Sequence, residues 1–124
     1  MLGMTQGAKT CLAALMVEHD QLGDSKRVLE YGAELNEIAR QTEDVDKASH
    51  ALLYLGKAHT RLRAAAAGIE ALSAAIQLCE SAPNSSKAVG RSAECHELLS
   101  QCYIQQVQST TGWEKKLAEH ACSE

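Results

Sequence analysis

The sequence predicts an all-α fold in which antiparallel helix hairpins repeat along the chain. Composition predicts the helices, because the 124 residues include one proline and the apolar residues are mostly Ala and Leu, both strong helix formers. Apolar residues also recur at spacings of three and four in six stretches, which places them on one face of a helix. The pattern matches itself when it is shifted by forty residues. We therefore expect about three hairpins stacked in one domain.

Four helices are predicted between residues 8 and 86, and most of their ends carry recognisable signals. Gly23 can end the first helix in the left-handed conformation, and Asp24 or Ser25 can cap the second. The stretch "QTEDVD" offers several side chains that can cap the third. The link around "RLRAAAAG" has no helix breaker, so a turn is expected there from the repeat alone. Residues 1–7 are expected to form a disordered N-terminus.

The remaining helices are predicted after a clear break at Pro83, which cannot continue a helix, and the serines that follow it. A fifth helix follows the stripe that contains Cys95, Leu99 and Cys102. The stretch "QSTTGW" is expected to end this helix, and "WEKKLAEHAC" to form a short, weaker sixth helix. The helical domain therefore covers residues 8–124, with units at about 8–46, 47–86 and 87–124.

The repeat is visible residue by residue. A shift of forty places Leu12 on Leu52 and His19 on His59, and Leu15 and Leu22 likewise fall on leucines. The third unit fits with a shift of forty-four, which places His59 on Tyr103. The four extra residues fall in "SAPNSSK", a loop in which an insertion costs little free energy.

Helix pairs with this period resemble the tetratricopeptide repeat. "LGDSKRVLEYGAELNEIAR" is similar to the second helix of that family, and "ALLYLGKAHTRLR" to its first helix; the resemblance covers roughly residues 8–106. Gly32 departs from the family, which usually has an aromatic residue there, and Gly68 stands where Ala is usual. The spacing resembles the long-repeat subgroup found in scaffold proteins of the cell cortex, synapse and cilium. The resemblance implies a right-handed superhelical array that binds a peptide or helix of a protein partner in its concave groove.

The resemblance also implies which positions face the groove. Lys57 and Arg61 lie four residues apart, so they can hold a partner's carboxylate together or form a solvated basic turn. Ala13 and Val17 stand where chaperone-tail binding members have Lys and Asn, which favours a segment of a larger assembly instead. The implied groove residues are Thr10, Ala13, Val17, Asp20, Gln21, His50, Leu53, Lys57, Thr60, Arg61, Glu94, Glu97, Gln101, Ile104 and Gln105.

Charge and hydropathy argue against nucleic-acid and membrane partners. The formal net charge is −4 with scattered Lys and Arg, no apolar run reaches membrane-spanning length, and the first residues lack the basic and apolar regions of a secretory signal. Four of the five cysteines sit at apolar helical positions, which favours reduced thiols and a cytoplasmic location. The resemblance adds an association with the cytoskeleton or cilium.

No constellation in the sequence predicts an enzyme, a metal site or a cofactor. Cys95 and Cys102 share a helical face but lie two turns apart, about 10 Å along the axis, and no CxxC pair occurs. Two functions therefore remain open. One is an interaction scaffold with a groove. The other is a structural subunit or oligomerising bundle without one. An apolar edge with no capping helix at the end of the array also indicates either a fragment of a longer array or a subunit whose ends are covered by neighbours, including copies of itself through self-association.

Overall fold

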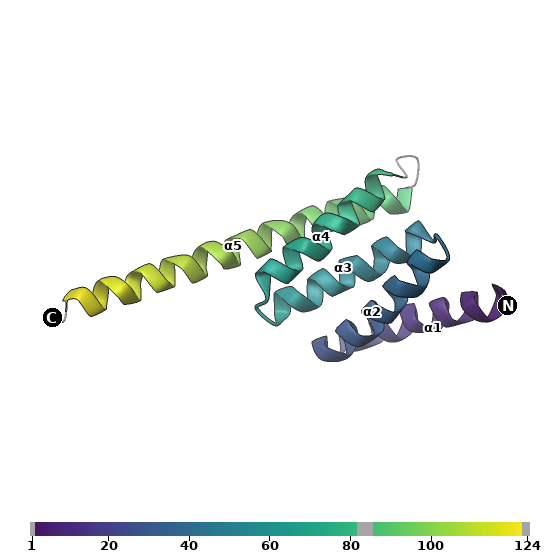
Figure 1. The fold of residues 1–124 in the computed structure, drawn as a ribbon, viewed down its shortest axis with the longest axis horizontal. Helices are drawn as coiled ribbons and strands as arrows, with labels where there is room; N and C mark the ends of the chain where they lie inside the picture. Colours follow the sequence, from purple (N-terminus) through teal and green to yellow (C-terminus); the bar gives the residue numbers. More distant parts are fainter. Residues whose placement is uncertain (1, 82–85, 123–124) are drawn as a thin grey trace.

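The computed structural model describes residues 2–81 and 86–122, and the side chains of residues 6–81 and 88–108. Its helices, in chain order, are α1 (Leu2–Gln21), α2 (Ser25–Gln41), α3 (Val45–Arg61), α4 (Ala65–Glu80) and α5 (Ser86–Cys122). Successive helices run in opposite directions, so α1 with α2 and α3 with α4 form hairpins (Figure 1). The all-α prediction is confirmed over the residues described. Pro83, the predicted break before α5, lies outside them.

The three connections between α1 and α4 share one geometry. Each has three residues, and the middle one has a positive φ: 78° at Gly23, 54° at Glu43 and 63° at Arg63. The last residue donates its N–H to a carbonyl five residues back, as Asp24 does to His19 at 2.9 Å. This is the Schellman arrangement that satisfies the last carbonyls of a helix. The same last residue is the N-cap of the next helix, so each turn is as short as the motif allows.

The helix ends repeat every forty residues, as the sequence predicted. α1 ends at Gln21 and α3 at Arg61, while α2 begins at Ser25 and α4 at Ala65. The turn predicted from the repeat within "RLRAAAAG" is confirmed by the end of α3 and the start of α4. The turn geometry itself recurs every twenty residues. The side-chain pattern does not show this shorter period, because alternate helices bury different residues.

The helices form two layers. α3 packs against all four other helices, whereas α2 and α4 make no close backbone approach to each other. Each of α1 and α5 packs on α3 and on its neighbour in the chain. Thus α1, α3 and α5 make up one layer, and α2 and α4 the other (Figure 1).

Small residues set the distance between the layers. Met16, Val28 and Leu35 are fully buried where α1, α2 and α3 meet, and a second cluster around Leu72 joins α3, α4 and α5. A Cβ added at Gly32 would lie 2.9 Å from Leu55 Cδ2, and one at Gly56 would overlap Leu72. Glycine at residue 32 is therefore explained by close packing of α2 on α3, a position where an aromatic side chain does not fit.

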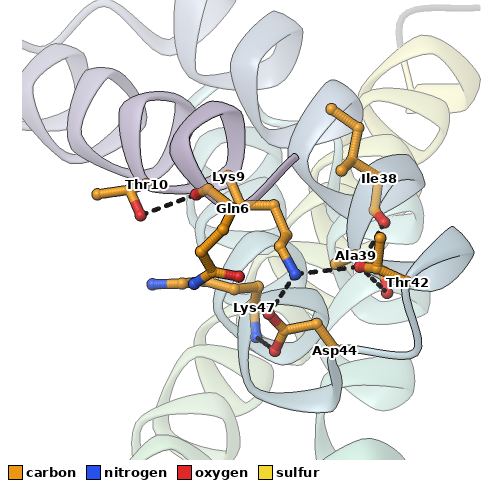
Figure 2. Close-up of polar contacts among 8 residues, drawn as sticks. All are labelled: Gln6, Lys9, Thr10, Ile38, Ala39, Thr42, Asp44 and Lys47. Atoms are coloured by element: carbon orange, nitrogen blue, oxygen red, sulfur yellow. Dashed lines mark hydrogen bonds and ion pairs between the residues drawn. The ribbon is translucent and has the colours of Figure 1, made fainter. Parts of the chain in front are cut away.

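A buried lysine fastens α1 to the turn between α2 and α3. The Lys9 side chain is 7% exposed, and its Nζ donates to Asp44 Oδ2 at 2.9 Å and to Thr42 Oγ1 at 3.1 Å (Figure 2). Asp44 also caps α3 by accepting the Lys47 N–H at 3.1 Å. One carboxylate therefore both starts α3 and positions α1 against it.

Two boundaries differ from the sequence prediction. α1 begins at Leu2, where residues 1–7 were expected to be disordered. The stretch "MLGMTQG" has no proline, and each glycine inside a helix costs only about 1 kcal/mol. α5 continues through "QSTTGW" to Cys122, so the predicted break and separate sixth helix are wrong. No proline interrupts this stretch either, and Ser and Thr weaken a helix without ending it.

Candidate partner-binding surface

The candidate site is the face of the α1–α3–α5 layer, which carries two depressions between α3 and α5. The first, of about 450 Å³, lies near the start of α3 and is lined by Asp46, Lys47, His50, Leu53, Tyr54, Gly90, Arg91 and Glu94. The second, of about 450 Å³, lies near the end of α3 and is lined by Thr60, Arg61, Arg63, Gln101, Ile104, Gln105 and Gln108. Both are shared by two helices that are far apart in the sequence.

Aromatic rings and charges of α3 build the first depression. The rings of His50 and Tyr54 lie edge to face with centroids 5.1 Å apart, and Lys57 Nζ lies 5.1 Å from the Tyr54 ring centroid. Across from them, Arg91 of α5 donates to Asp46 Oδ1 at 2.8 Å and to the Asp46 carbonyl oxygen at 2.9 Å. This link holds the start of α5 against the start of α3.

Burial raises the pKa of the Tyr54 hydroxyl; Lys57 and Arg91 oppose that shift, and Asp20 and Glu94 add to it. The hydroxyl therefore stays protonated at neutral pH and can donate a hydrogen bond. Burial likewise raises the pKa of Cys95 to about 12, with Cys79 and Glu94 adding to the effect. Cys95 behaves as a small apolar residue and not as a nucleophile.

The second depression has a polar floor. Thr60 Oγ1 donates to the Gly56 carbonyl oxygen at 2.8 Å and lies 3.1 Å from Cys102 Sγ, which joins α3 to α5. Gln105 Nε2 donates to the Thr60 carbonyl oxygen at 3.0 Å. Gln105 Oε1 is buried and has no hydrogen-bond partner among the described residues.

Lys57 and Arg61 are both paired within the chain, although the Arg61 side chain stays 44% exposed. Arg61 Nη1 binds Asp20 Oδ1 at 2.7 Å and the Asp20 carbonyl oxygen at 2.9 Å, and Lys57 Nζ lies 3.3 Å from Asp20 Oδ2. The Asp20 side chain is only 7% exposed. The two cations therefore pair with α1 of the same chain and hold α1 against α3.

By their exposure, the implied groove positions fall into three groups. Ala13, Asp20, Leu53 and Thr60 are buried, so they pack between helices, although Leu53 and Thr60 form the floors of the depressions. Val17, His50, Lys57 and Gln105 are half-buried. The exposed members are Thr10, Gln21, Arg61, Glu94, Glu97, Gln101 and Ile104. Those brought together at a depression are His50, Leu53, Glu94, Thr60, Arg61, Gln101, Ile104 and Gln105.

Tyr54 and Arg91 are parts of this surface that the sequence analysis missed. Tyr54 follows His50 by one helical turn, a spacing that places both on one face, but Arg91 lies in no apolar stripe and carries no signal of its partner. A further depression of about 410 Å³, mostly apolar, lies on the other layer between the ends of α2 and α4. It contains Ala39, Ala74 and Leu78 and was not foreseen, because it exists only where two helices diverge.

Comparison of the chain with protein-family models, with curated proteins and with solved structures finds no match. Within the described residues, no three His, Cys, Asp or Glu side chains are grouped as metal ligands would be. No described helix is both long enough and apolar enough to cross a bilayer. Cys79, Cys95 and Cys102 are buried free thiols, and Cys11 is an exposed one.

Proposed function

We propose that the chain is a tetratricopeptide-like interaction scaffold that binds a protein segment along the α1–α3–α5 face. The observation that carries the proposal is the layering: alternate helices lie side by side, and both depressions lie between two of them. In an array of hairpins, one layer of helices is free to contact a ligand because the other layer covers its back. A segment lying across α3 and α5 would contact both depressions at once.

The chemistry of the depressions favours an extended or helical segment with hydrogen-bond donors and one apolar anchor. Tyr54 can donate to a backbone carbonyl, and the exposed Gln101 amide can both donate to a partner and accept from it. Ile104, 55% exposed, supplies apolar contact at the second depression. Because Lys57 and Arg61 are paired with Asp20, a carboxylate on the partner is not required for recognition.

Selection from a displayed library of helical and extended segments tests this function. The test variant is Glu94→Arg with Gln101→Arg, two exposed positions seven residues apart that line different depressions. We expect selected segments to bind this variant at least tenfold more weakly than the original chain, measured by fluorescence anisotropy. The two arginine side chains would add both positive charge and bulk to the surface, and they would leave the core unchanged.

The matched control is Glu70→Arg with Gln77→Arg, which makes the same two changes at exposed positions seven residues apart on α4, in the other layer. The control should bind selected segments as the original chain does, with unchanged helicity by circular dichroism. Segments that lose affinity for the control but not for the test variant would place binding on the α2–α4 layer and overturn the proposal.

A further inference from the structure

A regularly spaced stripe of exposed side chains runs along α5. Its members lie alternately four and three residues apart: Val89, Ala93, His96, Ser100, Tyr103 and Val107. All six are exposed, and the large apolar ones are strongly so, at 63% for Val89, 53% for Tyr103 and 64% for Val107. A stripe with this spacing is the surface by which one helix packs along another.

The internal repeat shows what this stripe does in the earlier units. With the shift of forty-four, Ser100 and Tyr103 correspond to Gly56 and His59 of α3. At Gly56, α3 lies so close to α4 that an added Cβ would overlap Leu72. The equivalent position in α1 is Met16, which is fully buried beneath α2. The stripe of α5 is therefore equivalent to the surface of α1 that packs against α2 and to the surface of α3 that packs against α4.

On α5 this surface has no following helix to cover it among the described residues. The predicted sixth helix is instead the continuation of α5. The end of α5 projects beyond the rest of the molecule (Figure 1), and we call its residues 108–122 the arm. A helix that is continuous to Cys122 cannot fold back onto its own stripe. Isolated helices of about 15 residues are marginal in water, so an arm of this length needs a neighbour as much as the stripe does.

We propose that two copies of the chain pair through antiparallel α5 helices, with the arm of each copy lying on the stripe of the other. Each arm would then hold, on α5 of the other copy, the place that α4 holds on α3. The occupant is a second copy because the stripe is self-complementary. About a two-fold axis level with Gln105, Tyr103 of each copy meets Val107 of the other, which gives an apolar centre and a closed dimer.

The amino-acid sequence supports the same register at the ends of the stripe. The four-and-three spacing continues at Thr110, Glu114, Leu117 and Ala121. In the antiparallel register Ala93 stands opposite Leu117, so small meets large, and His96 stands opposite Glu114, so a base meets an acid. A parallel pairing would instead place His96 against His96 and Glu114 against Glu114. The antiparallel arrangement is therefore the one that the charges favour.

Light scattering after size exclusion tests the dimer. We expect a molar mass twice the 13.3 kDa of the chain, reduced to that of one chain by Tyr103→Glu with Val107→Glu. The control, Gln101→Glu with Gln108→Glu, adds the same charges on α5 outside the stripe and should remain a dimer. A monomeric original chain, or a control as monomeric as the test variant, would overturn the proposal.

Cross-linking decides the orientation and does not depend on the charge variants folding. In a chain whose Cys11 and Cys122 are changed to Ser, Ala93→Cys and Leu117→Cys are made singly. Oxidation of a mixture of the two proteins should give a disulfide-linked dimer, and oxidation of either alone should give none. Self-linking of Ala93→Cys would indicate a parallel pair and contradict the register. A chain that carries both cysteines is made as well. If it stays monomeric and forms an internal disulfide between residues 93 and 117, the arm folds back onto its own chain instead.

Discussion

Lys9 is the residue whose placement says most about how the first helix is held. It lies on the same helical face as Ala13 and Met16, its side chain is 7% exposed, and its ammonium group is paired with Asp44. Burial alone would raise the pKa of Asp44, but hydrogen bonds from Lys9 and from the Lys47 N–H outweigh burial, so the pKa is lowered. A lowered carboxyl pKa means that folding prefers the ionised form. The stability from this carboxylate is present above its unfolded pKa of about 3.9 and lost as pH falls through the folded value.

Asp44→Asn tests this contribution at the scale of one residue. Asn still caps a helix, so the change removes the ion pair and keeps the cap. We expect a loss of about 1–3 kcal/mol in unfolding free energy at pH 7, since a hydrogen bond to a charged group is lost, with a smaller difference below pH 4. Urea unfolding at several pH values measures both. Asp24→Asn is the control, because Asp24 caps α2 through the Arg27 N–H in the same way but is exposed. Equal losses in the two variants would contradict a role for Lys9.

At the scale of the helix, the turns between helices differ in one useful respect. Asp24 and Asp44 cap their helices with a side-chain oxygen, whereas Ala64, at the same place in the third turn, makes no such bond. Ala64→Asp should therefore stabilise the protein by about 1 kcal/mol through the new cap. Thermal unfolding followed by circular dichroism measures the change. Ala66→Asp adds the same charge to the first turn of α4 without being able to cap it. If that control stabilises the protein as much, the gain is due to the helix dipole alone.

Helix positions were predictable from the sequence to the extent that the repeat and the caps determined them. The turn at Arg63 has no breaker, but the preceding units locate it, because the same three-residue geometry closes each of them. The end of α5 was not predictable in this way. The sixth helix was predicted from a break in "QSTTGW", but this stretch has no proline and its one glycine costs only about 1 kcal/mol, so local chemistry allows a continuous helix. In the site, the groove positions were implied by the resemblance, which did not include Tyr54. The partner of Lys57 and Arg61 could not be predicted, since Asp20 belongs to a different hairpin.

For the molecule as a whole, the two-layer arrangement makes α3 the centre of the structure. It packs against all four other helices, and ion pairs tie it to both of its neighbours in the layer: Asp20 of α1 pairs with Arg61, and Arg91 of α5 pairs with Asp46. In an array of stacked elements, each element is stabilised mainly by its immediate neighbours. Loss of one ion pair should therefore increase local opening of the helix that it joins to α3 and leave the helix on the opposite side of α3 unchanged.

Hydrogen exchange followed by mass spectrometry tests this expectation with a matched pair of variants. Amides of α3 should exchange slowest in the original chain, because local opening is least favourable where the most neighbours pack. Asp20→Asn should speed exchange severalfold in α1 and leave the start of α5 unchanged. Asp46→Asn should do the reverse, with a smaller effect because the Asp46 side chain is 47% exposed and Asp20 only 7%. A uniform change across all helices in both variants would mean that the chain opens as one cooperative bundle, and that its helices are not coupled in series.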